Sequence, residues 1–251
     1  MTKVSLDRHD DGVRVITLRD PERRNAMGDE MGAELVKTAA AIGADHEARA
    51  VVVTGEGAAF CAGADLPALF GEHDRPITDT HQRLQGYYRA FFSVLELGLP
   101  TIAAVNGPAV GAGLNLAMAC DVRIAGPAAS FGATFAKIGL HPGGGCTWFL
   151  VRALGASRAL QTMLLAEPLD AQRAVDWGLA EGIENDPLGA AVTMAQRFAA
   201  VEPRLARHIK RSVGIAVQTG DLGAVVEYEL WAQAASASSP QLQEWVEKFR
   251  R

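Results

Sequence analysis

The chain opens with two short apolar runs that predict a β-hairpin. Residues 4–6 and 13–18 alternate between apolar and polar positions or are continuously apolar. Between them lies Asp10-Asp11-Gly12, a sequence typical of a turn. The fold is therefore expected to begin with strands.

Helical spacing and strand-like runs then alternate along the chain. Residues 27–42 carry apolar side chains at helical spacing, and residues 50–55 form a short β-branched run that ends in glycine. The same order returns with a helix over 84–95 and a strand over 101–105, and a further strand over 122–125 follows another helix. Alternating strands and helices predict an α/β fold with a mainly parallel sheet and right-handed crossovers.

Beyond about Gly189 the pattern predicts helices only. The expected helices cover residues 190–200, 203–217, 222–235 and 240–250. We therefore divide the chain into a core over 1–189 and a helical region over 190–251. Trp231 and Trp245 lie in this last region, and such large aromatic side chains suggest that it packs against its own core or against another subunit.

Composition and charge narrow the function classes. With 251 residues, 49% of them hydrophobic, the chain can bury one full core or one core with a smaller helical appendage. The net charge is −5, and acidic and basic residues are interspersed along the chain, so no nucleic-acid partner is predicted. No apolar stretch approaches the ~20 residues of a membrane span, and the first residues lack a signal core. Three cysteines without ligand spacing, Cys61, Cys120 and Cys146, predict no metal site and a reducing, cytoplasmic location.

Several familiar catalytic motifs are missing from the sequence. It contains no G-x-S-x-G elbow, no H-E-x-x-H, no C-x-x-C and no G-K-[ST] phosphate loop. Gly107, Gly111 and Gly113 do not have the G-x-G-x-x-G spacing and lie far from the first strand, so a nicotinamide cofactor is not expected.

Two segments rich in small residues, 59–66 and 106–114, carry the candidate chemistry. Where a strand turns into a helix, the first amide N–H groups lack intrahelical partners, and small side chains let a polarised oxygen approach them. Two such amides aimed at one carbonyl oxygen form an oxyanion hole. The alternative is that the glycines only permit close packing of helix against strand.

Together the segments resemble the enoyl-CoA hydratase/isomerase (crotonase) family over nearly the whole chain. The residues that carry this resemblance are 21–27, 59–66, 106–121, 131–132, 139–144 and 246–248. The resemblance implies a spiral of ββα units, a coenzyme A thioester as ligand without a further cofactor, and a C-terminal helical region used in a trimer or a dimer of trimers.

The resemblance also implies roles for individual residues. The backbone amides of Ala64 and Ala112 would form the oxyanion hole. The substrate-binding set would comprise Arg24, Ala62, Asp65, Leu66, Leu140 and, reaching a neighbouring subunit's nucleotide, Lys248. Asp65 and Asp121 also fit structural roles as cap or turn partners.

Two positions depart from the pattern of family members that hydrate enoyl-CoA. Those members carry one glutamate three residues after the second oxyanion residue and another four residues after the Phe-Gly pair. Here these positions are Asn115 and Phe135. An amide can hold a water but cannot accept its proton, and a phenyl ring can do neither. Ordinary hydration is therefore expected to be weak or absent.

Few side chains could replace the glutamates. His141 precedes the glycine-rich start of a helix and has a suitable unperturbed pKa of about 6.5. Cys146 could be activated by a helix N-terminus or could be a buried small hydrophobe. The segment 70–88, with His73, His81, Tyr87 and Tyr88, falls where the family places a variable wall over the acyl chain.

Three functions follow from these observations. The first is an acyl-CoA-binding member of the family, within fatty acyl-CoA metabolism, that has lost hydratase chemistry. The second is an active hydratase, isomerase, thioester hydrolase or decarboxylase that uses His141 or a water held by Asn115. The third is a structural oligomer that kept the fold and lost the ligand.

Overall fold

The computed structural model describes residues 2–72 and 74–250, which form two compact units. The first unit ends at Ala199 and the second begins at Ala200. The sequence analysis divides the chain at 189/190, whereas in the structure the helix over residues 187–199 belongs to the first unit.

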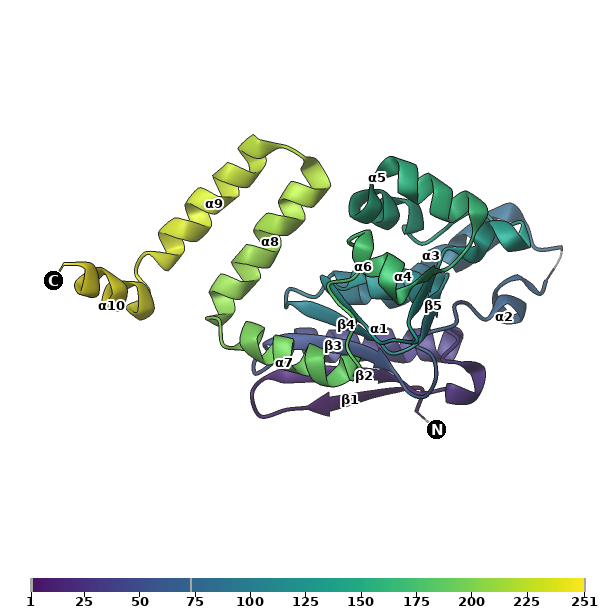
Figure 1. The fold of residues 1–251 in the computed structure, drawn as a ribbon, viewed down its shortest axis with the longest axis horizontal. Helices are drawn as coiled ribbons and strands as arrows, with labels where there is room; N and C mark the ends of the chain where they lie inside the picture. Colours follow the sequence, from purple (N-terminus) through teal and green to yellow (C-terminus); the bar gives the residue numbers. More distant parts are fainter. Residues whose placement is uncertain (1, 73, 251) are drawn as a thin grey trace. The chain divides into compact units, whose positions relative to one another are not determined.

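The first unit is built on a sheet of five strands in the order β1-β2-β3-β4-β6 (Figure 1). The strands are β1 (Val4–Arg8), β2 (Val13–Leu18), β3 (Ala50–Gly55), β4 (Thr101–Val105) and β6 (Val122–Ala125). β1 and β2 form the expected antiparallel hairpin, with Asp11 accepting the Val13 N–H at 3.0 Å in the turn, and the other neighbours are parallel. The predicted parallel sheet is confirmed.

Successive side chains of a strand point to opposite faces of the sheet, so alternate residues contribute to two apolar cores, one on each face. Val51 and Val53 face one core together with α1 (Asp29–Gly43), α3 (Ile77–Leu95) and α4 (Ala112–Ala119). Ala50 and Val52 face the other core, which α7 (Pro187–Ala199) closes with Ala191 and Ala195. Packing on the sheet is the reason why α7 is part of the first unit.

A second sheet of three strands, which the hydrophobic pattern did not predict, follows the main sheet. It has the order β5-β7-β8 and consists of β5 (Pro108–Val110), β7 (Ser130–Gly132) and β8 (Leu169–Asp170). These strands are too short to show a period of two. The remaining helical elements of the first unit are η1 (Pro21–Arg23), α2 (Leu66–Phe70), η2 (Thr134–Ile138), α5 (Cys146–Leu165) and α6 (Ala171–Asp176).

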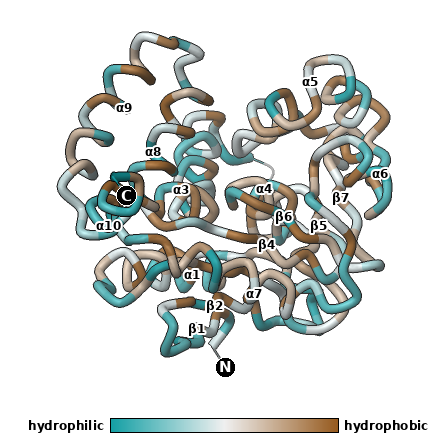
Figure 2. The backbone as a smooth tube through the Cα atoms, turned by 60° about the vertical axis from the view of Figure 1, so that its left-hand side comes forward, coloured by the Kyte–Doolittle hydropathy of each residue, from teal (hydrophilic) through white to brown (hydrophobic). Residues whose placement is uncertain are grey.

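The second unit consists of α8 (Pro203–Thr219), α9 (Leu222–Ser236) and α10 (Pro240–Phe249), close to the predicted ranges. His208 on α8 and Tyr228 on α9 are joined by a hydrogen bond of 2.7 Å. None of the described residues of these helices is buried in the single chain, and Figure 2 shows hydrophobic positions recurring along α8 and α9. Trp231 is 72% exposed.

No described helix is both long and apolar enough to cross a membrane.

Candidate functional site

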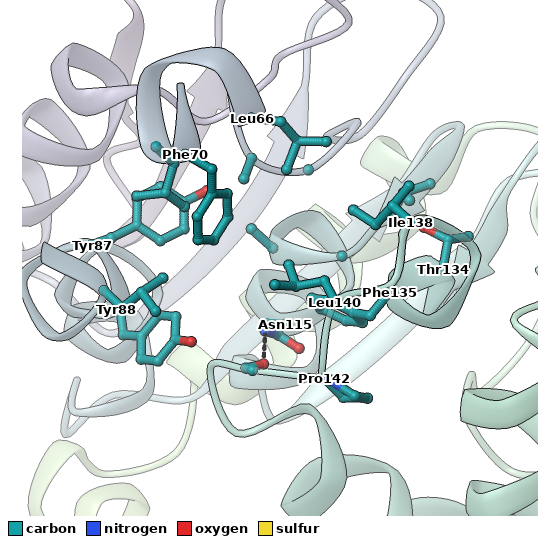
Figure 3. Close-up of a pocket in the computed structure, with 18 of the residues that line it drawn as sticks. Leu66, Phe70, Tyr87, Tyr88, Asn115, Thr134, Phe135, Ile138, Leu140 and Pro142 are labelled. Carbon is teal, nitrogen blue, oxygen red and sulfur yellow. Dashed lines mark hydrogen bonds between the residues drawn. The ribbon is translucent and has the colours of Figure 1, made fainter. Parts of the chain in front are cut away.

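A cavity of about 340 Å³ lies in the first unit, between the α2–α3 segment and the segment that runs from η2 to α5 (Figure 3). Aromatic and aliphatic side chains dominate its walls. Its lining consists of Ala62, Gly63, Ala64, Leu66, Leu69, Phe70, Leu84, Tyr87, Tyr88, Phe91, Val110, Gly111, Ala112, Asn115, Thr134, Phe135, Ile138, Leu140, His141, Pro142 and Gly143. This described lining includes no aspartate or glutamate.

The two small-residue segments meet at the floor of this cavity. Cys61 N–H donates to the Pro108 carbonyl at 3.1 Å, and Val110 N–H donates to the Cys61 carbonyl at 3.0 Å. A Cβ atom on Gly113 would overlap the Cys61 carbonyl, so only glycine permits this approach of α4 to the first segment. The close packing of the two segments at the cavity therefore depends on these small residues.

The backbone N–H of Ala64 is left free by the way its segment pairs. Met27 N–H donates to Gly63 at 2.7 Å, and the Met27 carbonyl accepts from Asp65 N–H at 3.2 Å. Met27 thus pairs with the Gly63 carbonyl and the Asp65 N–H, the backbone groups on either side of Ala64. Because backbone N–H groups along an extended chain point alternately to opposite sides, the N–H of Ala64 points away from Met27.

The N–H of Ala112 is free for a different reason. Ala112 is the first residue of α4, and the first amides of a helix have no intrahelical acceptor. Gly111 precedes it with φ 54°, which turns the chain from β5 into the helix. Neither Ala64 nor Ala112 donates a backbone hydrogen bond within the described part of the chain, and both line the cavity. Two unpaired donors therefore border one apolar space.

Asn115 lies one turn beyond Ala112 on α4 and is 2% exposed. Its Nδ2 donates to the Gly143 carbonyl at 2.9 Å, as Figure 3 shows, while its Oδ1 is buried without a partner among the described residues. Phe135, on η2, adds an apolar surface to the same cavity. Neither side chain can take up a proton near neutral pH.

Two tyrosines on α3 form part of the opposite wall. The Tyr87 hydroxyl donates to the Met27 carbonyl at 3.1 Å, and burial strongly raises its pKa. Burial also raises the pKa of Tyr88, against a smaller lowering effect of the Gly144 backbone. Both side chains are therefore neutral phenols at physiological pH.

His141 is exposed at the cavity wall, with Nδ1 2.8 Å from the Pro142 carbonyl. When Nδ1 carries the proton and donates to that carbonyl, Nε2 is left as an acceptor. Cys146 is 1% exposed, and burial raises the pKa of its thiol to about 12. It is thus a buried small hydrophobe rather than an activated thiolate.

Some residues of the expected substrate-binding set do not line the cavity. The Arg24 side chain is exposed outside the described lining, and its carbonyl accepts from Ala62 N–H at 2.9 Å. Asp65 pairs with Arg23 at 2.7 Å and caps α2 by accepting the Ala68 N–H at 3.4 Å. Its pKa is lowered mainly by the Arg23 hydrogen bond.

Further residues singled out in the sequence lie elsewhere. Lys248 belongs to the second unit, where its Nζ lies 4.7 Å from the centre of the Trp245 ring. Asp121 accepts the Thr101 N–H at 2.8 Å and thereby holds the start of β4, as a structural partner would. His81 is exposed outside the described lining, and His73 lies outside the described residues.

Sequence reasoning missed the contacts of Gly143 and the contributions of Thr134 and Ile138 to the wall. The Phe-Gly motif locates the start of η2, but its short 3-10 turn has no periodic signal. Within the described residues, no group of three or more histidine, cysteine, aspartate or glutamate side chains is arranged to hold a metal ion.

Comparisons with known proteins agree with this architecture. The sequence matches the enoyl-CoA hydratase/isomerase family over residues 8–250. A Mycobacterium tuberculosis protein named "Probable enoyl-CoA hydratase" is 46% identical over 243 residues, 95% of this chain and 93% of the relative. The 1,2-epoxyphenylacetyl-CoA isomerase of Escherichia coli is 32% identical over 251 residues, 99% of this chain and 96% of the relative.

A crystal structure of an enoyl-CoA hydratase from Bacillus anthracis has a TM-score of 0.90 with 29% identity and covers 99% of this chain and 96% of that chain. The crotonase fold inferred from the sequence is thereby confirmed. The chain belongs to the enoyl-CoA hydratase/isomerase family.

Proposed function

We propose that the protein binds acyl-CoA thioesters, with the thioester oxygen between the backbone amides of Ala64 and Ala112. The observation that carries this proposal is the pair of unpaired N–H groups at one apolar cavity. Members of this family act on coenzyme A thioesters. Two amide donors would polarise the carbonyl and stabilise negative charge that develops on its oxygen.

The same site is poorly equipped for hydration. Adding water across a double bond requires a group that removes a proton from water and one that protonates the neighbouring carbon. Asn115 and Phe135 stand at the positions expected for those groups, and the described lining contains no carboxylate. Each missing acid–base partner is worth about 10²–10⁴ in rate. We therefore propose that hydration of ordinary enoyl-CoA is weak or absent.

The remaining substrate contacts are proposals by resemblance. Ala62, Leu66 and Leu140 line the cavity and would contact the ligand directly. Arg24 and Asp65 lie at or beside the first small-residue segment, where Arg24 would approach the nucleotide from outside. Lys248 would act on the nucleotide of a neighbouring subunit.

An active enzyme of another reaction type is the second candidate function. His141 favours it, because a titratable ring borders the cavity and can present Nε2 as an acceptor. A water held by the unpartnered Oδ1 of Asn115 is the other group that could take part in a reaction. An isomerase, thioester hydrolase or decarboxylase would fit either group.

Two assays on the same preparation test the proposed function. Calorimetric titration with a saturated acyl-CoA measures binding without turnover, and optical assay of crotonyl-CoA measures hydration. We expect saturable binding together with hydration lower by at least about 10³ than that of a two-glutamate relative. Turnover within tenfold of that relative would show that other groups supply the chemistry. No binding at millimolar ligand would instead favour a structural oligomer.

Self-association and location are separate proposals. We propose a trimer or a dimer of trimers formed through the helical region, and the exposed Trp231, Leu230 and Ile209 there support this assignment. A molar mass of three or six chains in light scattering would support it, whereas a monomer at high concentration would contradict it. We also propose a cytoplasmic location, which fractionation of cells would test.

A further inference from the structure

One turn of the chain lies between two cavity side chains. The carbonyl of Gly143 accepts from Asn115 Nδ2 at 2.9 Å, and the Tyr88 oxygen lies against Gly143. A Cβ on Gly143 would overlap the Tyr88 oxygen, and a Cβ on Gly144 would lie 2.6 Å from Asn115 Nδ2. The two glycines thus let Tyr88 and Asn115 close on this turn.

The Tyr88 hydroxyl lies against this turn without donating a hydrogen bond to it. No hydrogen bond of the described residues has the Tyr88 O–H as its donor, and Figure 3 shows the hydroxyl directed across the cavity on the side of Asn115. Its neighbour Tyr87 differs, because that hydroxyl donates to the Met27 carbonyl. A phenol placed against this turn in a largely apolar wall therefore keeps an unused donor.

The turn at Gly143 and Gly144 also indicates where the Tyr88 O–H would lie along a bound acyl chain. Asn115 follows Ala112 by three residues on α4, and side chains at this spacing are neighbours about 5–6 Å apart. A thioester oxygen at the Ala112 amide would therefore place the first carbons of the acyl chain near Asn115 and the Gly143 turn. Tyr88 lies against that turn.

We infer that Tyr88 determines acyl specificity by donating a hydrogen bond to an oxygen carried by the acyl chain a few bonds beyond the thioester. The inference rests on the proposed acyl-CoA binding. A plain alkyl chain in the same place removes water from the hydroxyl without giving it an acceptor, and an unpaired buried donor is costly. The site then favours oxygenated acyl groups over alkyl groups of equal length.

Calorimetric titration with acetoacetyl-CoA and butyryl-CoA tests this inference. Both acyl groups have four carbons, and the 3-oxo group of the first accepts a hydrogen bond but cannot donate one. We expect the wild-type protein to bind acetoacetyl-CoA about three- to tenfold more tightly, the range of one neutral hydrogen bond. Tyr88→Phe should bring the ratio of the two dissociation constants close to one.

Tyr87→Phe is the matched control, because its hydroxyl is already bonded to Met27. This variant should lower the thermal midpoint and leave the affinity ratio unchanged. Equal wild-type affinity for the two ligands, or an unchanged ratio in folded Tyr88→Phe, would overturn the inference while leaving acyl-CoA binding intact. If the wild-type protein bound neither ligand, the proposed function would fail, and the inference with it. The wild-type ratio requires no variant, so the test holds even if Tyr88→Phe does not fold.

Discussion

Asn115 Nδ2 donates to the Gly143 carbonyl at 2.9 Å, and this bond ties α4 to the turn that precedes α5. The bond sets the orientation of the Asn115 amide, so that its Oδ1 is the atom left without a partner. Asn115 thus acts as a fixed hydrogen-bonding group between α4 and this turn.

Asn115→Asp should destabilise the protein at neutral pH. The substitution replaces the donor with a carboxylate oxygen that faces the Gly143 carbonyl, and an unsatisfied buried acceptor costs about 1–3 kcal/mol. Burial raises the pKa of the new carboxyl above its unfolded value of about 3.9. The loss in free energy of unfolding relative to wild type should therefore be smallest below pH 4 and grow as the pH rises. Urea unfolding at several pH values measures it, and a pH-independent loss would contradict the account.

Gly113→Ala should separate the two small-residue segments. The added methyl would overlap the Cys61 carbonyl, and overpacking of this kind costs about 1–3 kcal/mol. Gly86→Ala is the control, because a Cβ there meets nothing within 4 Å inside α3. It should stabilise the protein by about 0.5–1 kcal/mol. Urea unfolding of both variants checks the prediction, and equal stability of the two would contradict it.

His141→Ala distinguishes a structural histidine from an acid or base. Because Nδ1 lies beside the Pro142 carbonyl, we expect the substitution to loosen this turn and to leave turnover of the folded fraction unchanged. Steady-state kinetics on whichever acyl-CoA the protein turns over, with folding checked by circular dichroism, supplies the test. A fall in kcat of about 10² or more with normal binding would identify His141 as the acid or base of the second candidate function.

Asp65→Asn should remove a pH-dependent contribution to stability. The Arg23 hydrogen bond lowers the pKa of Asp65, so its stabilising effect is present above the unfolded pKa of about 3.9. That effect is lost as the pH falls through the lower folded value. Asparagine keeps the cap on α2, which isolates the ion pair. Thermal midpoints of variant and wild type should differ at pH 7 and converge near pH 2, and a constant difference would argue against the pairing.

The sequence predicted the long elements better than the short ones. Val51, Val53 and their neighbours form a β-branched run, and the range that it predicts for β3 is the range seen in the structure. The strands β7 and β8 have three and two residues, too few for any period to be visible. The sequence left open which surface α7 covers, because an amphipathic pattern shows that a helix has an apolar face but not what packs against it.

The candidate site was predictable where it follows the backbone. Ala64, Ala112, Asn115 and Phe135 all line the cavity, because small-residue turns fix where their segments run. Side-chain partners across the cavity could not be predicted in the same way. The contact between Tyr88 and the Gly143 turn joins segments that are 55 residues apart, and nothing local in either segment indicates it.

The most direct test of the account is a crystal structure with a bound, unreactive acyl-CoA thioester. We expect the thioester oxygen about 2.7–3.1 Å from the backbone nitrogens of both Ala64 and Ala112. The acyl chain should run past Asn115 between Tyr88 and Phe135. A thioester oxygen bound elsewhere, with these two amides facing solvent or another part of the ligand, would contradict the central claim.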